Sequence, residues 1–166
     1  WQLHVDAGRR VGTALLELAP SAQFINTGTG LVYGDSFGDG KALDETAALR
    51  PRDEYAASKA AGDLALGVLA RKGLRCVIMR PFNQIGPGQS EDFVVPAFAA
   101  QVARIEAGRA EPVIRVGNLD AERDFVDVRD VAEAYVAALR RSDDIPTGTI
   151  FNLASGTPRR IGAVLD

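Results

Sequence analysis

The sequence has few of the residues that build disulfides and metal sites. It contains one cysteine, Cys76, and one histidine, His4, in 166 residues. A single cysteine excludes an intramolecular disulfide, and Cys76 lies in the apolar run Cys76-Val77-Ile78-Met79, which predicts a buried, inert thiol. With one histidine, on an expected helix, there is no material for a Ser-His-Asp triad or a multi-histidine centre, and we predict no metal site.

An excess of one charge and a long apolar run are also missing. The 22 acidic and 19 basic residues give a net charge of −3 without blocks of like charge, so a nucleic-acid-binding surface is not expected. No apolar run approaches a membrane span of about 18 residues, and the first residues show no signal-peptide pattern. The composition, 46% hydrophobic and 25% charged, is that of a soluble globular protein, and the expected location is the cytoplasm.

Apolar periodicity, interrupted by glycine and proline, predicts alternating helices and strands. In chain order we expect a helix ending near Pro20, a strand over 22–27, a loop over 34–50, a helix over 53–72 and a strand over 75–79. Beyond Gly88 we expect a helix over 93–107, strands over 112–116 and 125–128, a helix over 129–140, a strand over 149–153 and the start of a helix over 157–166. This order indicates an α/β domain in two parts, with parallel strands and right-handed crossovers.

Tyr55 and Lys59 are four residues apart on the predicted helix and therefore share one face. A phenol beside an ammonium group can donate a proton at a lowered pKa, although two residues on a solvated face would show the same spacing. Thr29 and Asn83 each follow the end of a predicted strand, where open α/β sheets bind ligands. A Thr29 hydroxyl that hydrogen-bonds a substrate carbonyl would suit reduction of that carbonyl or the reverse reaction. Alternatively, Thr29 is a turn residue whose side chain fixes its own backbone.

Three motifs, in this order and spacing, carry a family resemblance: Thr27-Gly-Thr-Gly-Leu-Val-Tyr-Gly34, Tyr55-Ala-Ala-Ser-Lys59 and Arg80-Pro-Phe-Asn-Gln-Ile-Gly-Pro-Gly-Gln89. Together they resemble the extended short-chain dehydrogenase/reductases that act on nucleotide sugars. The second half, with Phe93-Val-Val-Pro-Ala-Phe98, Glu111 to Phe125 and Asp127-Val-Arg-Asp-Val131, is similar to the GDP-4-keto-6-deoxy-D-mannose reductases and, less closely, to the GDP-mannose 4,6-dehydratases.

The resemblance implies a Rossmann-like, doubly wound parallel sheet with a smaller α/β substrate-binding part. Residues 1–88 would be the C-terminal half of the dinucleotide-binding domain, and residues 89–166 mainly the nucleotide-sugar-binding part, incomplete at its end. The implied catalytic residues are Thr29, Tyr55 as general acid and Lys59 as its partner. Thr27, Gly28, Tyr55, Lys59, Pro81 and Phe82 would contact the cofactor, NADP(H) or NAD(H), with Lys59 on the nicotinamide ribose.

For the substrate, the resemblance implies contacts from Thr29, Asn83, Val94, Val95, Asn118 and Arg123. Asn83 would face the phosphates, and Arg123 would clamp the diphosphate because its planar fork of donors matches phosphate oxygens. Two alternatives stay open: an ion pair of Arg123 with Asp120 or Asp124, and an Asn83 side chain that caps the turn at Gly86.

Several positions depart from the family pattern. Leu31 stands where the dehydratases carry a proton-transferring Glu, which disfavours dehydration. Arg9 replaces an Asn that serves a water relay, and Ala100 replaces a Lys near the nucleotide. The largest departure is the absence of a Gly-x-x-Gly-x-x-Gly loop, which would bring backbone N–H groups to the cofactor pyrophosphate. We therefore expect this chain to be a fragment of such an enzyme.

The sequence thus predicts an NAD(P)H-dependent oxidoreductase that reduces the C4 ketone of a GDP-4-keto-6-deoxy-hexose to GDP-rhamnose. The alternatives are a nucleotide-sugar 4-epimerase or 4,6-dehydratase of the same family, and a cofactor-free fragment that acts only as a binding or structural module. The expected partner is a small nucleotide sugar, not nucleic acid or a membrane. A homodimer through Ala60, Leu64 and Val68 is a further expectation.

Overall fold

The computed structural model describes residues 1–40 and 42–165. Two compact units divide the chain: the first comprises Trp1–Phe82 and Asp130–Leu153, and the second comprises Asn83–Arg129 and the segment from Ala154 onward. The chain therefore leaves the first unit after Phe82 and returns to it at Asp130.

A three-stranded parallel sheet forms the centre of the first unit. Its strands are β1 (Phe24–Thr27), β2 (Cys76–Pro81) and β6 (Thr149–Leu153), in the order β1-β2-β6. Ile78 pairs with Asn26 on one side and with Ile150 on the other. β2 is buried along its whole length, as its continuous apolar run predicts for a central parallel strand. The parallel sheet and its helices confirm the predicted α/β class.

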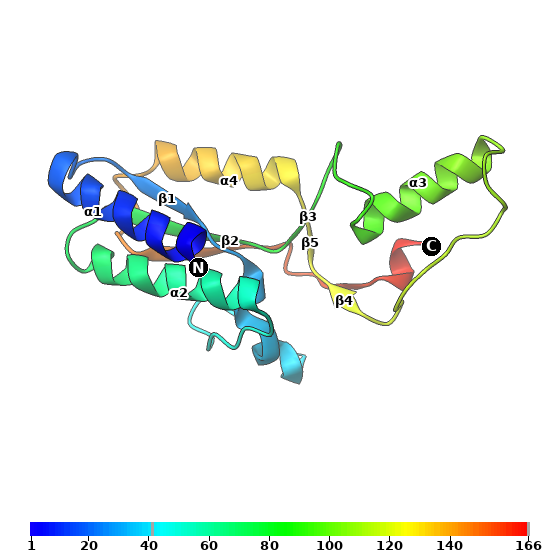
Figure 1. Cartoon of the computed structure of the whole chain (residues 1–166), viewed down its shortest axis with the longest axis horizontal. Helices are drawn as coiled ribbons and strands as arrows, with labels where there is room; N and C mark the ends of the chain where they lie inside the picture. Colours follow the sequence, from blue (N-terminus) through cyan, green and yellow to red (C-terminus); the bar gives the residue numbers. More distant parts are fainter. Residues whose placement is uncertain (41, 166) are drawn as a thin grey trace. The chain divides into compact units, whose positions relative to one another are not determined.

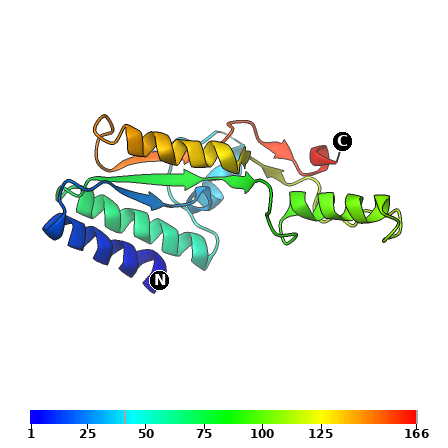
Figure 2. The same cartoon turned by 90° about the horizontal axis from the view of Figure 1, so that it is seen from above.

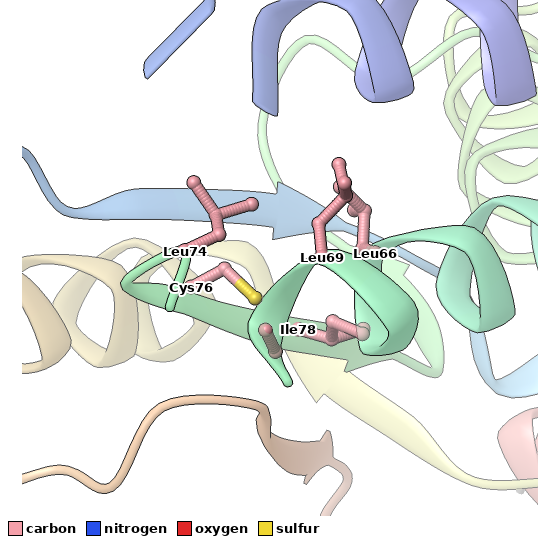
Figure 3. Close-up of a cluster of buried hydrophobic side chains, with 6 residues drawn as sticks. Leu66, Leu69, Leu74, Cys76 and Ile78 are labelled. Atoms are coloured by element: carbon pink, nitrogen blue, oxygen red, sulfur yellow. The ribbon is translucent and has the colours of Figure 1, made fainter. Parts of the chain in front are cut away.

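Helices cover both faces of this sheet (Figures 1 and 2). The π-helical segment η1 (Gln2–Ala7) with α1 (Gly8–Leu18), and α2 (Glu54–Ala70), lie on one face, and α4 (Val128–Arg140) lies on the other. Alternate side chains of β2 point to opposite faces. Cys76 and Ile78 pack with leucines of α2, as Figure 3 shows, whereas Val77 and Met79 pack with Ala138 of α4. The buried Cys76 thiol, whose pKa burial raises, agrees with the sequence prediction.

The two crossover connections have opposite hands. Both step in the same direction across the sheet, yet α2 covers one face between β1 and β2, and α4 covers the other between β2 and β6. The expectation that both crossovers are right-handed is therefore wrong for one of them. The right-handed rule applies to a strand that feeds its helix directly, and the β2–β6 connection instead passes through the second unit before it reaches α4.

Local sequence signals explain where α2 begins and ends. Asp53 is the N-cap, and its carboxylate accepts a hydrogen bond from the Ala56 backbone N–H at 2.7 Å. The helix ends before Gly73, which adopts a positive φ of 104° that favours glycine. The predicted helix over 53–72 is therefore confirmed to within two residues at each end.

The predicted loop over 34–50 was wrong in its first part. Gly30–Asp39, labelled η2, consists of two short 3-10 helices on either side of a kink at Gly34, and its N-cap is Thr29. The kink requires glycine, because Gly34 has a φ of 45° and lies so close to Arg50 that an added Cβ would be 1.9 Å from the Arg50 carbonyl oxygen. The sequence did not indicate this short helical segment, because it is rich in glycine and because 3-10 turns have little apolar periodicity.

The second unit contains short strands and one long helix. β3 (Asn83–Ile85) pairs in parallel with β5 (Phe125–Asp127), and β4 (Glu122–Arg123) pairs antiparallel with β7 (Arg159–Arg160). The remaining elements are α3 (Val94–Glu106) and the 3-10 turn η3 (Gly162–Val164). The strand predicted over 112–116 is absent from the described residues, and the helix predicted over 157–166 is instead β7 and η3.

Within residues 1–40 and 42–165, no helix is long and apolar enough to cross a membrane.

Candidate functional site

The carboxyl end of β1 anchors the Lys59 side chain. Lys59 Nζ donates a hydrogen bond of 2.8 Å to the carbonyl oxygen of Thr27, the last residue of β1. On the opposite face of the sheet, the Tyr135 hydroxyl of α4 donates to Thr27 Oγ1 at 2.9 Å. Thr27 is thus held by one helix from each layer, and the ammonium group of Lys59 has a fixed position relative to the strand. The contribution of Tyr135 was not evident from the sequence, because it depends on the α4 face that packs on β1.

Tyr55 lies in the first turn of α2 and is half exposed, with 47% of its surface accessible. Lys59 Nζ is 6.0 Å from the centre of the Tyr55 ring. The spacing of four residues therefore places the phenol and the ammonium group on the same exposed part of α2, as predicted. At this distance the cation can stabilise a phenolate electrostatically.

His4 contacts the same turn of α2, which the sequence did not indicate. Its ring packs edge-on against Tyr55, with 5.4 Å between ring centres. Its Nδ1 lies 2.8 Å from the Ser58 hydroxyl, which donates its own hydrogen to the Tyr55 carbonyl at 2.7 Å. His4 Nδ1 is therefore the donor to Ser58. Burial lowers the pKa of His4, and the nearby Lys59 cation lowers it further.

Thr29 is 7% exposed and follows β1 by two residues. Its Oγ1 accepts a hydrogen bond from the Leu31 N–H at 3.3 Å, so the alternative role as a turn residue is observed. Accepting this bond does not use the hydrogen of the hydroxyl group, which can still donate to another oxygen. The turn role and the predicted role toward a substrate carbonyl are therefore compatible.

The residues after β2 pack closely against this turn. The Phe82 N–H donates to the Leu153 carbonyl at 2.9 Å, which extends the pairing of Pro81 with β6. A Cβ at Gly30 would lie 2.7 Å from the Phe82 ring, and one at Gly28 would lie 3.1 Å from the Met79 carbonyl oxygen. Thr27, Gly28, Pro81 and Phe82, the predicted cofactor contacts beside Tyr55 and Lys59, therefore belong to one compact unit.

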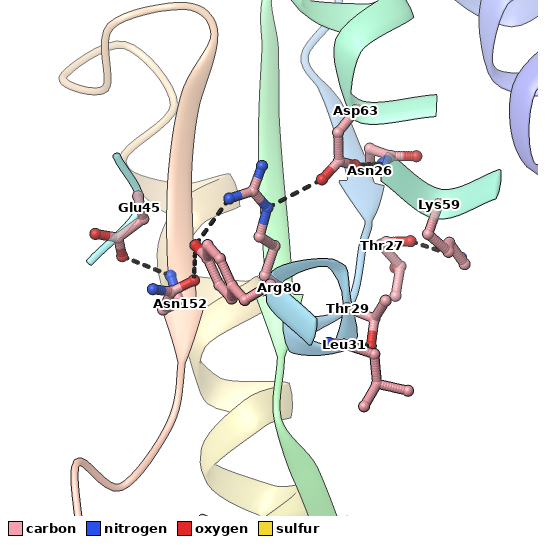
Figure 4. Close-up of polar contacts among 10 residues, drawn as sticks. Asn26, Thr27, Thr29, Leu31, Glu45, Lys59, Asp63, Arg80 and Asn152 are labelled. Carbon is pink, nitrogen blue, oxygen red and sulfur yellow. Dashed lines mark hydrogen bonds and ion pairs between the residues drawn. The ribbon is translucent and has the colours of Figure 1, made fainter. Parts of the chain in front are cut away.

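A buried polar network lies at the same ends of the strands (Figure 4). Arg80 Nε of β2 forms an ion pair of 3.0 Å with Asp63 of α2, and Arg80 Nη1 donates to the Tyr33 hydroxyl at 2.8 Å. Burial raises the pKa of the Asp63 carboxyl group, and the hydrogen bond from Arg80 opposes this rise. This network was not evident from the sequence; the signal available was an Asp four residues after Lys59, on the same helix face.

In the second unit, Asn83 and Asp124 are neighbours. The Asn83 amide Nδ2 and backbone N–H both donate to the Asp124 carbonyl, each at 3.2 Å. The Asn83 side-chain amide therefore bonds the residue that precedes β5, not the turn at Gly86. The Asp124 carboxylate accepts the backbone N–H groups of Ser155 and Gly156 at 2.7 and 2.8 Å.

Arg123 is exposed, and its Nη1 donates to the Glu122 carbonyl at 2.7 Å. The alternative ion pair of Arg123 with Asp120 is not observed, since the Asp120 carboxylate pairs with Arg160 instead. Asn118 Oδ1 accepts the Asp120 N–H at 3.0 Å and so shapes the loop before β4.

Val94 and Val95 form the first turn of α3, where helix N–H groups have no partner within the helix. This is a position in which backbone donors can bind a ligand oxygen; the contact of Val94 and Val95 with a nucleotide stays a prediction. Thr27, Gly28, Thr29, Tyr55, Lys59, Pro81 and Phe82 lie in the first unit, and Asn83, Val94, Val95, Asn118 and Arg123 lie in the second.

Comparison with known proteins gives a family match over most of the chain. The model of the NAD dependent epimerase/dehydratase family matches residues 1–154. The GDP-6-deoxy-D-mannose reductase of Pseudomonas aeruginosa is 36% identical over 147 residues, which cover 88% of this chain and 47% of that protein. The dTDP-glucose 4,6-dehydratase of Streptomyces niveus is 33% identical over 152 residues, covering 89% of this chain and 42% of that protein.

A solved structure shares this fold. The structure described as RMD from Pseudomonas aeruginosa complexed with NADPH superposes with a TM-score of 0.86 at 32% identity, covering 96% of this chain and 53% of that one. The resemblance stated from the motifs is therefore confirmed, as is the Rossmann-like fold. This chain spans about half the length of the relatives that it matches.

Proposed function

Because the chain belongs to the NAD dependent epimerase/dehydratase family, we propose that it is part of an oxidoreductase acting on nucleotide sugars. The proposed reaction is reduction of the C4 ketone of GDP-4-keto-6-deoxy-mannose to GDP-rhamnose, with NADPH or NADH as the cofactor. The observation that carries this proposal is the arrangement of Tyr55 and Lys59 beside the end of β1, together with 36% identity to a protein named GDP-6-deoxy-D-mannose reductase.

The three catalytic candidates have distinct proposed roles. Tyr55 gives its phenolic proton to the oxygen of the ketone as that oxygen becomes an alkoxide. Lys59, held by Thr27, places its ammonium group beside the anion that Tyr55 becomes when it gives up its proton. Thr29 donates a hydrogen bond to the same substrate oxygen and so orients the carbonyl group.

The residues present fit one part of a nicotinamide cofactor. Lys59 carries three ammonium hydrogens, of which the bond to Thr27 uses one, and a ribose offers hydroxyl oxygens as acceptors. Phe82 and Pro81 would supply apolar contact for the nicotinamide ring. When bound, the cofactor would supply the hydride. The pyrophosphate has no matching glycine loop in this chain.

The second unit supplies the proposed contacts with the nucleotide sugar. Arg123 is exposed and has a planar guanidinium group, which suits a diphosphate. Asn83, Asn118 and the backbone N–H groups of Val94 and Val95 offer further donors. Each of these assignments is a proposal that follows from the family motifs.

A dehydratase or epimerase of the same family is the second candidate. Its support is the 33% identity to a dTDP-glucose 4,6-dehydratase. Leu31 argues against dehydration, because a leucine side chain that is 51% exposed stands where a proton-transferring carboxylate would be needed. Product analysis with a panel of GDP-, dTDP- and UDP-linked sugars separates the candidates.

The main test is Tyr55→Phe in the full-length protein. We expect kcat to fall by about 100-fold or more, since the proton donor is removed, while binding of the nucleotide sugar stays unchanged. Turnover is followed by NADPH oxidation, and binding by calorimetry. A Tyr55→Phe variant with near-normal turnover would overturn the proposed role.

A second pair of variants tests the cation. Lys59→Met removes the ammonium group that contacts Thr27 and faces Tyr55, and we expect a similar loss of turnover. Lys72→Met is the matched control, because Lys72 follows the end of α2 and is exposed. Equal activity of the two variants would contradict a role for Lys59.

A further inference from the structure

A chain of polar side chains connects every strand of the first unit with α2 (Figure 4). Asp63 of α2 accepts hydrogen bonds from Asn26 of β1 at 3.3 Å and from Arg80 of β2 at 3.0 Å. Arg80 also donates to the Tyr33 hydroxyl of η2 at 2.8 Å, and Tyr33 donates to Asn152 Oδ1 of β6 at 2.8 Å. Each shared group acts in a chemically consistent way, since the Tyr33 hydroxyl accepts one bond and donates the other.

The charged pair in this network is almost completely buried. The side chains of Arg80 and Asp63 are 3% and 2% exposed. Removing two charges from water is costly, and an apolar pair of similar volume often gives a fold that is as stable or more so. A contribution to stability is therefore a weak explanation for the buried pair. A better explanation is that the pair fixes a geometry, because hydrogen bonds are directional and contacts between apolar side chains are not.

The geometry that the pair fixes is the position of α2 relative to β1. Lys59 and Asp63 are four residues apart and lie on the same face of α2. Lys59 is bonded to the carbonyl of Thr27, and Asp63 to the side chain of Asn26, which are consecutive residues of β1. Two parallel links therefore hold one face of the helix on the end of one strand. Rotation or sliding of α2 would stretch both.

The same pair also holds the segment that contains Thr29. Thr29 caps η2, and Tyr33 follows it by four residues inside that helix. Tyr33 is fully buried and bonded to Arg80, whose guanidinium carbon lies 5.1 Å from the centre of the Tyr33 ring. Arg80 is thus bonded through one nitrogen to α2 and through another to η2. The planar fork of arginine suits this double role, and the single ammonium group of a lysine does not.

We propose that Asp63 and Arg80 are positioning residues for the reaction, which set the placement of Tyr55 and Lys59 on α2 relative to Thr29 on η2. This inference rests on the proposed function. Asp63 and Arg80 act only through the residues that they hold. Asn26 and Tyr33 are the links through which the pair acts on β1 and η2.

The proposal predicts an effect that a purely structural role does not. When α2 is held less firmly, Tyr55 and Lys59 keep their mutual spacing on the helix but lose their placement relative to Thr29. The proton donor is then misplaced at the substrate oxygen, so kcat falls while KM stays unchanged. A variant that only lowers the unfolding temperature leaves the kcat of the folded protein unchanged.

The experiment uses Asn26→Ala and Tyr33→Phe in the full-length protein. Both substitutions keep the Asp63–Arg80 pair and change no charge, so any loss of kcat comes from geometry and not from a new charge. Replacing Asp63 or Arg80 alone would strand a buried charge and endanger folding. Folding is checked by circular dichroism and NADPH binding by fluorescence, and kcat and KM are measured by NADPH oxidation with GDP-4-keto-6-deoxy-mannose.

We expect each variant to lose about 10-fold or more in kcat, because small misplacements of catalytic groups are costly, with KM and NADPH binding unchanged. Ser36→Ala is the control, since it removes a hydrogen bond of 2.7 Å to the Ala48 carbonyl from the same η2 segment without touching the network. Folded variants with the wild-type kcat overturn the proposal. Retained turnover in Tyr55→Phe would instead overturn the proposed function, so the two failures can be distinguished.

Discussion

At the residue scale, the sequence predicted positions along the chain better than hydrogen-bond partners. Tyr55 and Lys59 could be assigned because a spacing of four on a helix fixes their mutual position. The partner of Lys59, the Thr27 carbonyl, could not be assigned, because it depends on where β1 lies against α2. The bond from Tyr135 to Thr27 was missed for the same reason. Contacts between segments that are far apart in the chain can be assigned only when the packing of those segments is known.

Asp127 is a residue whose titration can be predicted. Its carboxylate accepts hydrogen bonds from the Arg129 side chain and backbone N–H, which hold the pKa of Asp127 at about 2, below its ordinary value of 3.8. A lowered pKa means that the ionised form favours the folded state. This contribution is present above pH 3.8 and is lost as the pH falls toward 2.

Arg129→Ala should raise the pKa of Asp127, because the hydrogen bonds from the Arg129 side chain are the largest cause of its lowering. The value should stay below 3.8, since the backbone N–H of residue 129 still donates. Carboxyl carbon chemical shifts measured against pH report this directly. An unchanged pKa in the variant would show that the guanidinium group does not set it.

At the element scale, long periodic segments were predicted well and short ones were not. The helices found as α2, α3 and α4 and the strand β6 agree with the predicted ranges within two residues. The strand expected over 112–116 was wrong, since the apolar residues Val113, Ile114 and Val116 there have no partner strand in the described residues. The strands β4 and β7, of two residues each, are too short to show any periodicity.

The contact of α2 with η1 gives a prediction at this scale. A Cβ at Gly62 of α2 would lie 2.5 Å from the His4 carbonyl oxygen, which is backbone and cannot rotate away. Gly62→Ala should therefore push the two helices apart and destabilise the fold by about 1–3 kcal/mol. The displaced His4 would also lose its contact with Tyr55.

Gly67→Ala is the matched control on the same helix. The atom nearest to a Cβ added at Gly67 is Arg71 Nη1, at 3.9 Å, which is an ordinary van der Waals contact. Alanine also has the higher helix propensity, so this variant should gain about 0.5–1 kcal/mol. Urea denaturation of both variants measures the difference. Equal stabilities would mean that η1 does not pack closely on α2.

At the scale of the whole molecule, the sequence predicted an α/β fold but not the route of the chain through it. The return of residues 130–153 to the first unit, after residues 83–129 have formed part of the second unit, is a long-range feature that no local pattern encodes. It also explains why one crossover departs from the expected hand. The assignment of residues 1–88 and 89–166 to cofactor and substrate remains a prediction.

The absence of a glycine loop from this sequence leads to a prediction about cofactor binding. The pyrophosphate of NADPH is held in Rossmann folds by backbone N–H groups of that loop and by a helix N-terminus. In this chain, the proposed contacts, Lys59, Pro81 and Phe82, would serve only the ribose and the nicotinamide. The 166-residue chain should therefore bind NADPH about 100-fold or more weakly than a member of the family that carries the glycine loop does. Fluorescence titration of NADPH against both proteins measures the ratio. Equal affinities would place a pyrophosphate site within residues 1–166 and would require a different set of donors for it.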